Sequence, residues 1–217
     1  MTRRSTTVPG KGNPWLQVPL EDYERHMDLP EIGQAVMLSE AMAQAVREFH
    51  PQSAAIAGCA GGNGIVRIAA MGVERIAGID VNAAYIAAVH ERLGSWLPGL
   101  ELHLADIQAG VPDCAPVELV FAGLLLEYVE VGPTLQVLRT LCTPGGALVI
   151  VLQRPSDTKP AVSVYAYTSL LALESVLQLR DPDAVTVAAK FAGFTEHSRR
   201  CEVLESGKEF EILSFRA

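Results

Sequence analysis

The feature that most constrains the fold of this chain begins at Pro51, where short apolar runs alternate with segments of helical periodicity. The runs are about four to seven residues long and the segments between them about ten, which predicts β-α-β crossovers and a parallel sheet covered by helices on both faces. We expect strands at 54–57, 75–79, 100–104, 118–122 and 147–152, and helices that reach about residue 71 and cover 82–93 and 134–141.

The C-terminal part of the chain follows a different pattern. A helix is predicted at 183–191, and Gly193 suits a left-handed cap at its end. Two further strands, 195–204 and 210–215, are joined by a tight glycine-containing turn at 205–208, so we expect them to be antiparallel neighbours. The predicted fold class is therefore α/β. It is a three-layer sandwich with a mostly parallel, seven-stranded sheet that ends in an antiparallel C-terminal hairpin strand.

The first 50 residues precede this alternation. Residues 1–13 are polar and are expected to form a loose arm, and residues 20–27 are expected to form a short helix. Pro30 is expected in the first turn of a second helix, with Asp28 as its cap and an end near His50. We therefore divide the chain into an N-terminal arm and helical segment, 1–50, and one α/β domain, 51–217.

Composition narrows the class of protein. The chain is 49% hydrophobic and 19% charged, as expected for a globular α/β protein. No apolar run approaches the roughly 18 residues that span a bilayer, and no signal peptide is recognised, so no membrane association is expected. The four cysteines form no C-x-x-C pair, which favours a reducing, cytoplasmic location over a zinc or disulfide framework. They are Cys59, Cys114, Cys142 and Cys201.

The formal net charge of −8 also bears on the partners of this protein. An acidic surface repels phosphate backbones, so extended nucleic-acid binding is disfavoured. A small-molecule partner is the default expectation. The oligomeric state stays open, with a homodimer among the options.

The strongest local signal is a run of small residues that directly follows the first predicted strand and opens a helix. Its sequence is Ala57-Gly58-Cys59-Ala60-Gly61-Gly62-Asn63-Gly64. Small residues let the backbone turn sharply and approach a ligand, which the helix N-terminal amides then face. Asp80 ends the second strand, where a carboxylate can accept both hydroxyls of an adenosine ribose.

Glycine spacing separates two adenosine-containing cofactors. The dinucleotide fingerprint is G-x-G-x-x-G. From Gly58 it requires a glycine at position 60, which is Ala60, and from Gly62 it requires one at position 67, which is Arg67. The failed fingerprint argues against an NAD(P)-dependent oxidoreductase. Small residues instead occupy every second position from 58 to 64.

With these motifs in place, the chain resembles the class I S-adenosylmethionine-dependent methyltransferase family, whose fold is Rossmann-like, over roughly residues 50–217. The glycine loop is similar to the family's first motif in its G-C-A-x-G-N-G form. The second and third motifs resemble 79–82 and 104–107. Further matches are 120–129, for the fourth strand and the turn behind the sulfonium, 138–149, for the proline-glycine-glycine turn into strand five, and 191–194 with the closing hairpin.

The resemblance implies S-adenosylmethionine as cofactor, S-adenosylhomocysteine as product, and an N-terminal helical lid over the cofactor. One position departs from the family, which often has an acid two residues before the first glycine to hold the cofactor's amino-acid end. Here that position is Ile56, so backbone groups or the N-terminal helices would have to substitute. The implied cofactor-binding residues are Gly58, Cys59, Ala60, Gly62, Asn63, Gly64, Asp80, Val81, Asn82, Ala105, Asp106, Ile107, Gly123 and Leu124.

The catalytic residues are harder to predict, because the family has no fixed catalytic residue and a base is needed only if the acceptor must lose a proton. Tyr23 and His26 lie three apart on one face of the N-terminal helix and are candidates to line the acceptor pocket, with His26 as a base. Alternatively, Tyr23 packs under the lid and His26 lies on the surface. Glu127, after the fourth strand, could orient or deprotonate the acceptor, or else cap a helix or pair with an arginine. Gln153 faces the same rim, but packing explains it more simply. No metal is expected.

We therefore expect a methyltransferase that acts on a small-molecule acceptor. A non-catalytic protein that binds S-adenosylmethionine or S-adenosylhomocysteine is the alternative, and a pocket mouth blocked by the 155–168 insert would favour it. The third hypothesis is an NAD(P)-dependent oxidoreductase.

Overall fold

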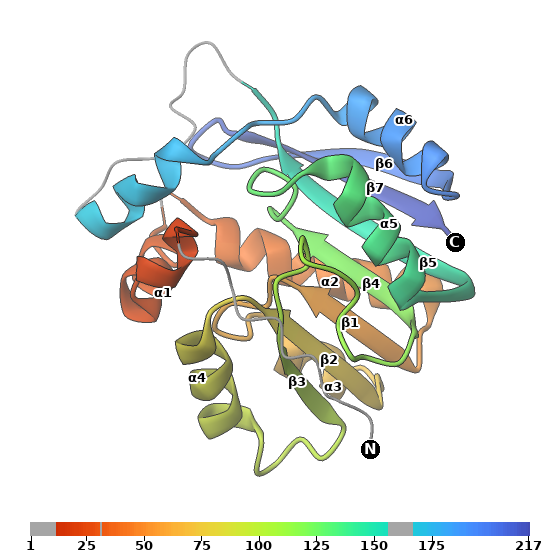
Figure 1. Cartoon of the computed structure of the whole chain (residues 1–217), viewed down its shortest axis with the longest axis horizontal. Coiled ribbons are helices and arrows are strands. Elements are labelled where there is room, and N and C mark those ends of the chain that lie inside the picture. Colours follow the sequence, from red (N-terminus) through yellow and green to blue (C-terminus); the bar gives the residue numbers. More distant parts are fainter. Residues whose placement is uncertain (1–11, 31, 156–166) are drawn as a thin grey trace.

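Figure 1 shows the computed structural model, in which residues 12–30, 32–155 and 167–217 are described. Its centre is a seven-stranded sheet with the strand order β3-β2-β1-β4-β5-β7-β6. The first five strands pair in parallel, β7 is antiparallel to β5, and β6 is antiparallel to β7. The predicted fold class, including the antiparallel hairpin, is confirmed. The strands are β1 (Ser53–Ala57), β2 (Arg75–Asp80), β3 (Leu100–Leu104), β4 (Val117–Gly123), β5 (Cys142–Gln153), β6 (Thr195–Val203) and β7 (Glu209–Arg216).

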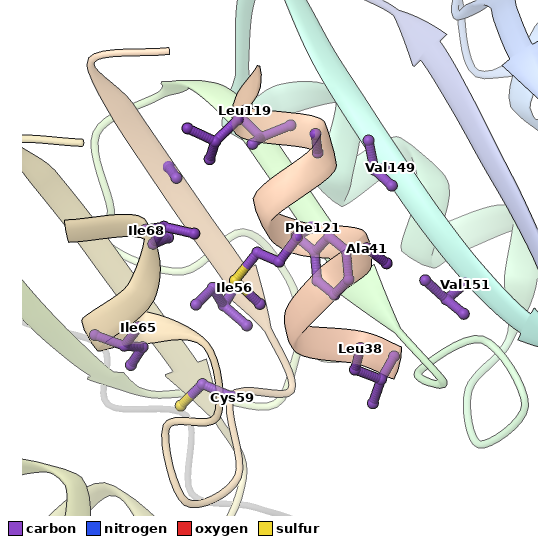
Figure 2. Close-up of a cluster of buried hydrophobic side chains, with 14 of the residues drawn as sticks. Leu38, Ala41, Ile56, Cys59, Ile65, Ile68, Leu119, Phe121, Val149 and Val151 are labelled. Atoms are coloured by element: carbon purple, nitrogen blue, oxygen red, sulfur yellow. The ribbon is translucent and has the colours of Figure 1, made fainter. Parts of the chain in front are cut away.

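Helices cover both faces of this sheet (Figure 1). One face packs against α2 (Gln34–Phe49), α3 (Ile65–Ala70) and α4 (Ala83–Leu93), and the other against α5 (Val131–Leu141) and α6 (Pro182–Phe191). Side chains alternate between the faces along each strand because a strand has a period of two. Figure 2 shows Leu38 and Ala41 of α2 facing Ile56, Phe121 and Val149 of three neighbouring strands.

The short N-terminal helix α1 (Leu20–Met27) lies where it was predicted. For the next helix the predicted end near His50 is confirmed, but the predicted start was wrong. Helix α2 begins at Gln34, after Gly33 with a left-handed φ of 63°. Pro30 precedes that turn, and Asp28 caps the end of α1, with its N–H donating to the Glu24 carbonyl oxygen at 2.9 Å. A left-handed glycine breaks the helical path, so Pro30 cannot occupy the first turn of α2.

Two short 3-10 helices complete the fold, η1 (Pro14–Gln17) and η2 (Thr168–Ser175). They contact each other and bring the N-terminal segment beside the chain that follows β5. Within the described ranges, no helix is long and apolar enough to cross a membrane.

Candidate functional site

A cavity lies at the carboxyl ends of the parallel strands, with walls from the N-terminal segment, the strand ends and η2. All three predicted catalytic residues line it: Tyr23, His26 and Glu127. Parallel α/β sheets bind ligands at this edge. Of the predicted cofactor-binding residues, nine line the cavity: Gly58, Ala60, Asp80, Val81, Ala105, Asp106, Ile107, Gly123 and Leu124.

The other predicted cofactor-binding residues lie beside this cavity. Cys59, Gly62 and Asn63 line a second cleft, between the glycine loop and helices α1 and α2. Gly64 lines neither space, because it is the N-cap of α3 and packs against Met42. The side chain of Asn82 accepts the Ala84 N–H and donates to the Trp15 carbonyl oxygen, both at 2.9 Å, so it caps α4 and holds the N-terminal segment.

The glycine loop turns sharply between β1 and α3. Its residues Gly58, Ala60, Gly62 and Gly64 all have positive φ, of 76°, 43°, 86° and 83°. Such angles favour glycine, and a Cβ atom at Gly62 would also lie 3.4 Å from the Ile65 and Val89 side chains. The alternation of small residues in the sequence therefore follows from the backbone conformation of the loop.

Asp80 links this loop to the end of β2. Its Oδ2 accepts the Ala60 N–H and its Oδ1 accepts the Asn82 N–H, each at 2.9 Å. The residue is 8% exposed, and burial raises the pKa of its carboxyl while the backbone N–H donors oppose that shift. Each carboxylate oxygen has lone-pair capacity for a further donor, so Asp80 can still receive hydroxyl groups from the cavity.

Two buried residues, one within the loop and one directly before it, serve as packed side chains of the core. Cys59 is buried, and burial raises the pKa of its thiol, so it is a packed side chain rather than a thiolate. Ile56, at the position that departs from the family pattern, is buried in the same cluster (Figure 2).

Glu127 also lines the cavity and is 1% exposed. Its Oε1 accepts the Gln153 N–H at 2.8 Å, and its Oε2 has no hydrogen-bond partner among the described residues. Burial raises the pKa of this carboxyl to about 7. Glu127 does not cap α5, whose N-cap is Glu130, and Arg180 donates to the carbonyl oxygens of Leu126 and Val129. A buried carboxyl with this pKa can exchange a proton near neutral pH.

His26 is 8% exposed, so the interpretation of this residue as a surface histidine is wrong. Burial lowers its pKa, and the charge of Lys208 adds to that shift, so the imidazole is neutral at pH 7. Its Nδ1 has no hydrogen-bond partner in the part of the chain that is described. Tyr23 is half-buried, and desolvation of its hydroxyl, Asp80 and Glu24 raise its pKa, so its phenol stays protonated.

The N-terminal segment is fastened over the cavity by contacts with α4 and η2. The Tyr85 hydroxyl donates to the Val18 carbonyl oxygen at 2.9 Å, and the Ser169 hydroxyl donates to Asp22 at 2.6 Å. Arg92 binds the Glu24 carboxylate through both of its terminal nitrogens. Figure 1 shows α1 between α4 and the η2 segment. The family resemblance implies a lid in this segment, and that role stays a prediction.

Sequence reasoning missed several residues of the cavity, above all Lys208, and it undervalued Gln153. Lys208 is 6% exposed, and burial lowers the pKa of its amine to about 8. It stands two residues before the buried Phe210 and so lies on the inward face of the hairpin. This two-residue spacing from Phe210 is the one signal in the sequence that points to Lys208. Trp15, Gln34 and Tyr85 are among the other lining residues that it did not predict for the site.

One group of potential metal ligands occurs among the described residues, on and beside the edge strand β3. It consists of Glu101, His103 and Cys114, and none of them lines the cavity. Arg75 donates to both oxygens of Glu101, at 2.8 and 2.9 Å, and lies 3.7 Å from the Cys114 sulfur. A guanidinium therefore holds the place that a metal ion would take. Residues 156–166 lie outside the described ranges, so the expectation about the 155–168 insert stays a prediction.

The chain is similar to known proteins both in sequence pattern and in fold. A family model described as "Methyltransferase domain" matches residues 56–150. No curated protein matches the chain in sequence. Among solved structures, the chain is similar to the N-methyltransferase NodS from Bradyrhizobium japonicum WM9 in complex with S-adenosyl-L-homocysteine. The TM-score is 0.68 and the identity 17%, over 90% of this chain and 92% of that chain.

Two further structures have the same fold. One is an S-adenosylmethionine-dependent methyltransferase from Mesorhizobium loti, with a TM-score of 0.63 and 18% identity over 82% of this chain and 98% of that chain. The other is the [4+2]-cyclase SpnF, with a TM-score of 0.66 and 11% identity over 82% of this chain and 80% of that chain.

Proposed function

We propose that this protein transfers a methyl group from S-adenosylmethionine to a small-molecule acceptor, since a family model described as "Methyltransferase domain" matches its residues 56–150. The observation that carries this proposal is the composition of one cavity. It is lined by residues of the glycine loop and Asp80, which fit the methyl donor, and by the buried Glu127 and His26, which we assign to the acceptor.

The residues of the first group fit the adenosine part of the methyl donor. Asp80 has acceptor capacity for the ribose hydroxyls, and the loop backbone is shaped so that a ligand can approach it closely. Asp106, Val81 and Ile107 line the same cavity, with a carboxylate and two apolar side chains for the adenine ring.

Glu24 supports a role for the N-terminal helix in holding the amino-acid end of the donor. It lines the second cleft, and its Oε1 lies 2.0 Å from where a Cβ atom at Gly61 would stand. Because Ile56 offers no carboxylate, we assign to Glu24 the task of receiving the donor's ammonium group.

When bound, S-adenosylmethionine supplies a sulfonium methyl group, whose bond to sulfur breaks with the electron pair left on sulfur while the acceptor's lone pair forms the new bond. The protein's own contribution is to hold the acceptor in line, about 3 to 3.5 Å from the methyl carbon. Glu127 accepts the proton that the acceptor loses. Tyr23 and His26 position the acceptor from the lid side.

Calorimetric titration with S-adenosylmethionine, S-adenosylhomocysteine and NADH tests the donor site. We expect the first two to bind at about micromolar Kd and to lose binding in Asp80→Ala, while the matched variant of an exposed residue, Asp113→Ala, binds as the parent does. Binding of NADH alone would overturn the proposal in favour of an oxidoreductase.

A second candidate is a protein that binds the donor without methyl transfer. Its basis is that one structure of the same fold is named as a [4+2]-cyclase and not as a methyltransferase. Formation of S-adenosylhomocysteine with a panel of small amines and hydroxyl compounds separates the two candidates. Turnover with any acceptor supports the enzyme, and tight donor binding without turnover across the panel supports the binder.

A further inference from the structure

The end of the cavity near β5 and β7 joins a buried cation to two buried polar atoms without partners. The cation is Lys208, and the two atoms are His26 Nδ1 and Glu127 Oε2. Buried polar atoms in proteins are nearly always hydrogen-bonded. Two such atoms on the wall of one cavity therefore indicate a ligand that supplies their partners.

These groups are brought together by four elements that are distant in sequence. His26 comes from α1 and Lys208 from the turn before β7, and both line the cavity. Gln153, at the end of β5, pairs with Phe210 on β7, two residues beyond Lys208. The Gln153 N–H in turn donates to Glu127 Oε1. The cavity wall thus runs from a cationic region at Lys208 to a carboxyl group at Glu127.

We propose that the methyl acceptor is a small amine that also carries a carboxylate or another oxyanion, which Lys208 and His26 bind while the amine lies beside Glu127. This inference rests on the proposed function and names its acceptor class. An oxyanion that leaves water needs a cation or several donors as partners. Lys208 supplies the cation, and the neutral imidazole can donate one hydrogen bond through Nδ1.

The amine end has a matching environment. The Glu127 carboxylate attracts an ammonium group, and the rings of Tyr23 and Tyr128 line the same cavity. Aromatic faces attract cations, more strongly where water is excluded. The ammonium gives one proton to Glu127, the freed lone pair on nitrogen forms the bond to the methyl carbon, and the carbon–sulfur bond breaks with its electrons on sulfur. Glu127 then releases its proton to solvent with the products.

Ligand-observed NMR titration tests the oxyanion site with matched probes, acetate against acetamide and β-alanine against propylamine. The titrations use ligand-free protein and protein loaded with S-adenosylhomocysteine. We expect the carboxylate member of each pair to bind at least tenfold more tightly, and Lys208→Met to remove that preference. Lys208→Arg should keep most of it, and Lys190→Met, which changes an exposed lysine paired with Glu196, should keep all of it.

Equal binding of the carboxylates and their uncharged counterparts by the parent protein would overturn the inference, as would an undiminished preference in Lys208→Met. Thermal unfolding of each variant establishes that it is folded. Binding of S-adenosylhomocysteine is measured on the same samples, so failure of the proposed donor site is seen separately. Carboxylate preference in protein that does not bind S-adenosylhomocysteine would support the anion site and reject the methyltransferase proposal.

Discussion

The backbone N–H of Ala60 donates a 2.9 Å hydrogen bond to Asp80 Oδ2, which joins the glycine loop to the end of β2. Ala60 has a φ of 43°, a left-handed conformation that is uncommon for a residue with a side chain. The carboxylate helps to hold the loop in that conformation, because its other oxygen is fixed by the Asn82 N–H. The shape of the loop and the charge that faces the cavity therefore depend on one side chain.

Asp80→Asn should weaken both functions of this carboxylate. An amide keeps one acceptor and places an NH₂ group against a backbone N–H, so we expect a loss of stability of about 1–3 kcal/mol. The affinity for S-adenosylhomocysteine should fall by roughly ten- to a hundredfold. Urea unfolding and calorimetry measure the two effects. An unchanged affinity would show that the ribose does not bind at Asp80.

Glu127→Gln should change how stability depends on pH. The folded pKa of this carboxyl is raised to about 7, above the ordinary value of 4.5, so the folded state retains a proton that the unfolded state releases. Its contribution to stability is therefore fully present below about pH 4.5 and is lost as the pH rises through 7. Over that range the parent should lose on the order of 3 kcal/mol relative to Glu127→Gln.

Urea unfolding between pH 4.5 and 8 measures this difference. Glu91→Gln, a change at an exposed residue, should run parallel to the parent. If Glu127 is the base, methyl transfer by the parent should also rise through about pH 7, and that rise should be absent from Glu127→Gln. Parallel stability curves for the parent and Glu127→Gln would contradict the buried, proton-binding role.

Gly61→Ala should loosen helix α1 and leave global stability almost unchanged, whereas Gly99→Ala should lower global stability. A Cβ atom at Gly61 would meet the carboxylate of Glu24, the movable end of a long side chain, at 2.0 Å. Moving Glu24 breaks its pair with Arg92, a half-exposed ion pair of about 0.2–1 kcal/mol, so global stability should change little. Amide hydrogen exchange in α1 should become faster.

At Gly99 the atom that a Cβ would meet is the Glu74 carbonyl oxygen, at 1.8 Å. Backbone cannot move aside as a side chain does, so Gly99→Ala should lower the free energy of unfolding by about 1–3 kcal/mol or more. Exchange in α1 should follow that global change only. A local effect on α1 from Gly99→Ala, or none from Gly61→Ala, would refute the contact between Glu24 and the loop.

Tyr85→Phe should release the N-terminal segment from α4. The Tyr85 hydroxyl donates to the buried Val18 carbonyl oxygen, and its loss should cost about 1 kcal/mol. Limited proteolysis should then cleave the segment around η1 and α1 sooner. Bound S-adenosylhomocysteine should restore protection if the lid closes over it. Cleavage at the parent rate would show that this hydrogen bond does not fasten the lid.

The donor half of the site could be predicted from the sequence because its signals are local. Small residues alternate from 58 to 64, and Asp80 ends a recognisable strand, so their chemistry follows from short-range pattern alone. Lys208 belongs to no comparable motif, and only its spacing from Phe210 points to it. It ends a polar turn that looks like any hairpin, and its burial depends on β7 being placed beside β5, a long-range pairing. The error at Pro30 has a similar cause. Gly33 determines where α2 begins because its φ of 63° is left-handed, and a glycine in a sequence does not fix its own φ.

The family model covers residues 56–150, and only some of the residues that line the cavity lie within this range. The glycine loop, Asp80 and Glu127 lie inside it, whereas His26, Gln153 and Lys208 lie outside. Gln153 and Lys208 both follow residue 150, so the segment after that residue can vary while the glycine loop and Asp80 stay the same. In evolutionary terms this segment is a separable part of the cavity, and a chimera that exchanges only residues after 150 would carry Gln153 and Lys208 from one relative to another.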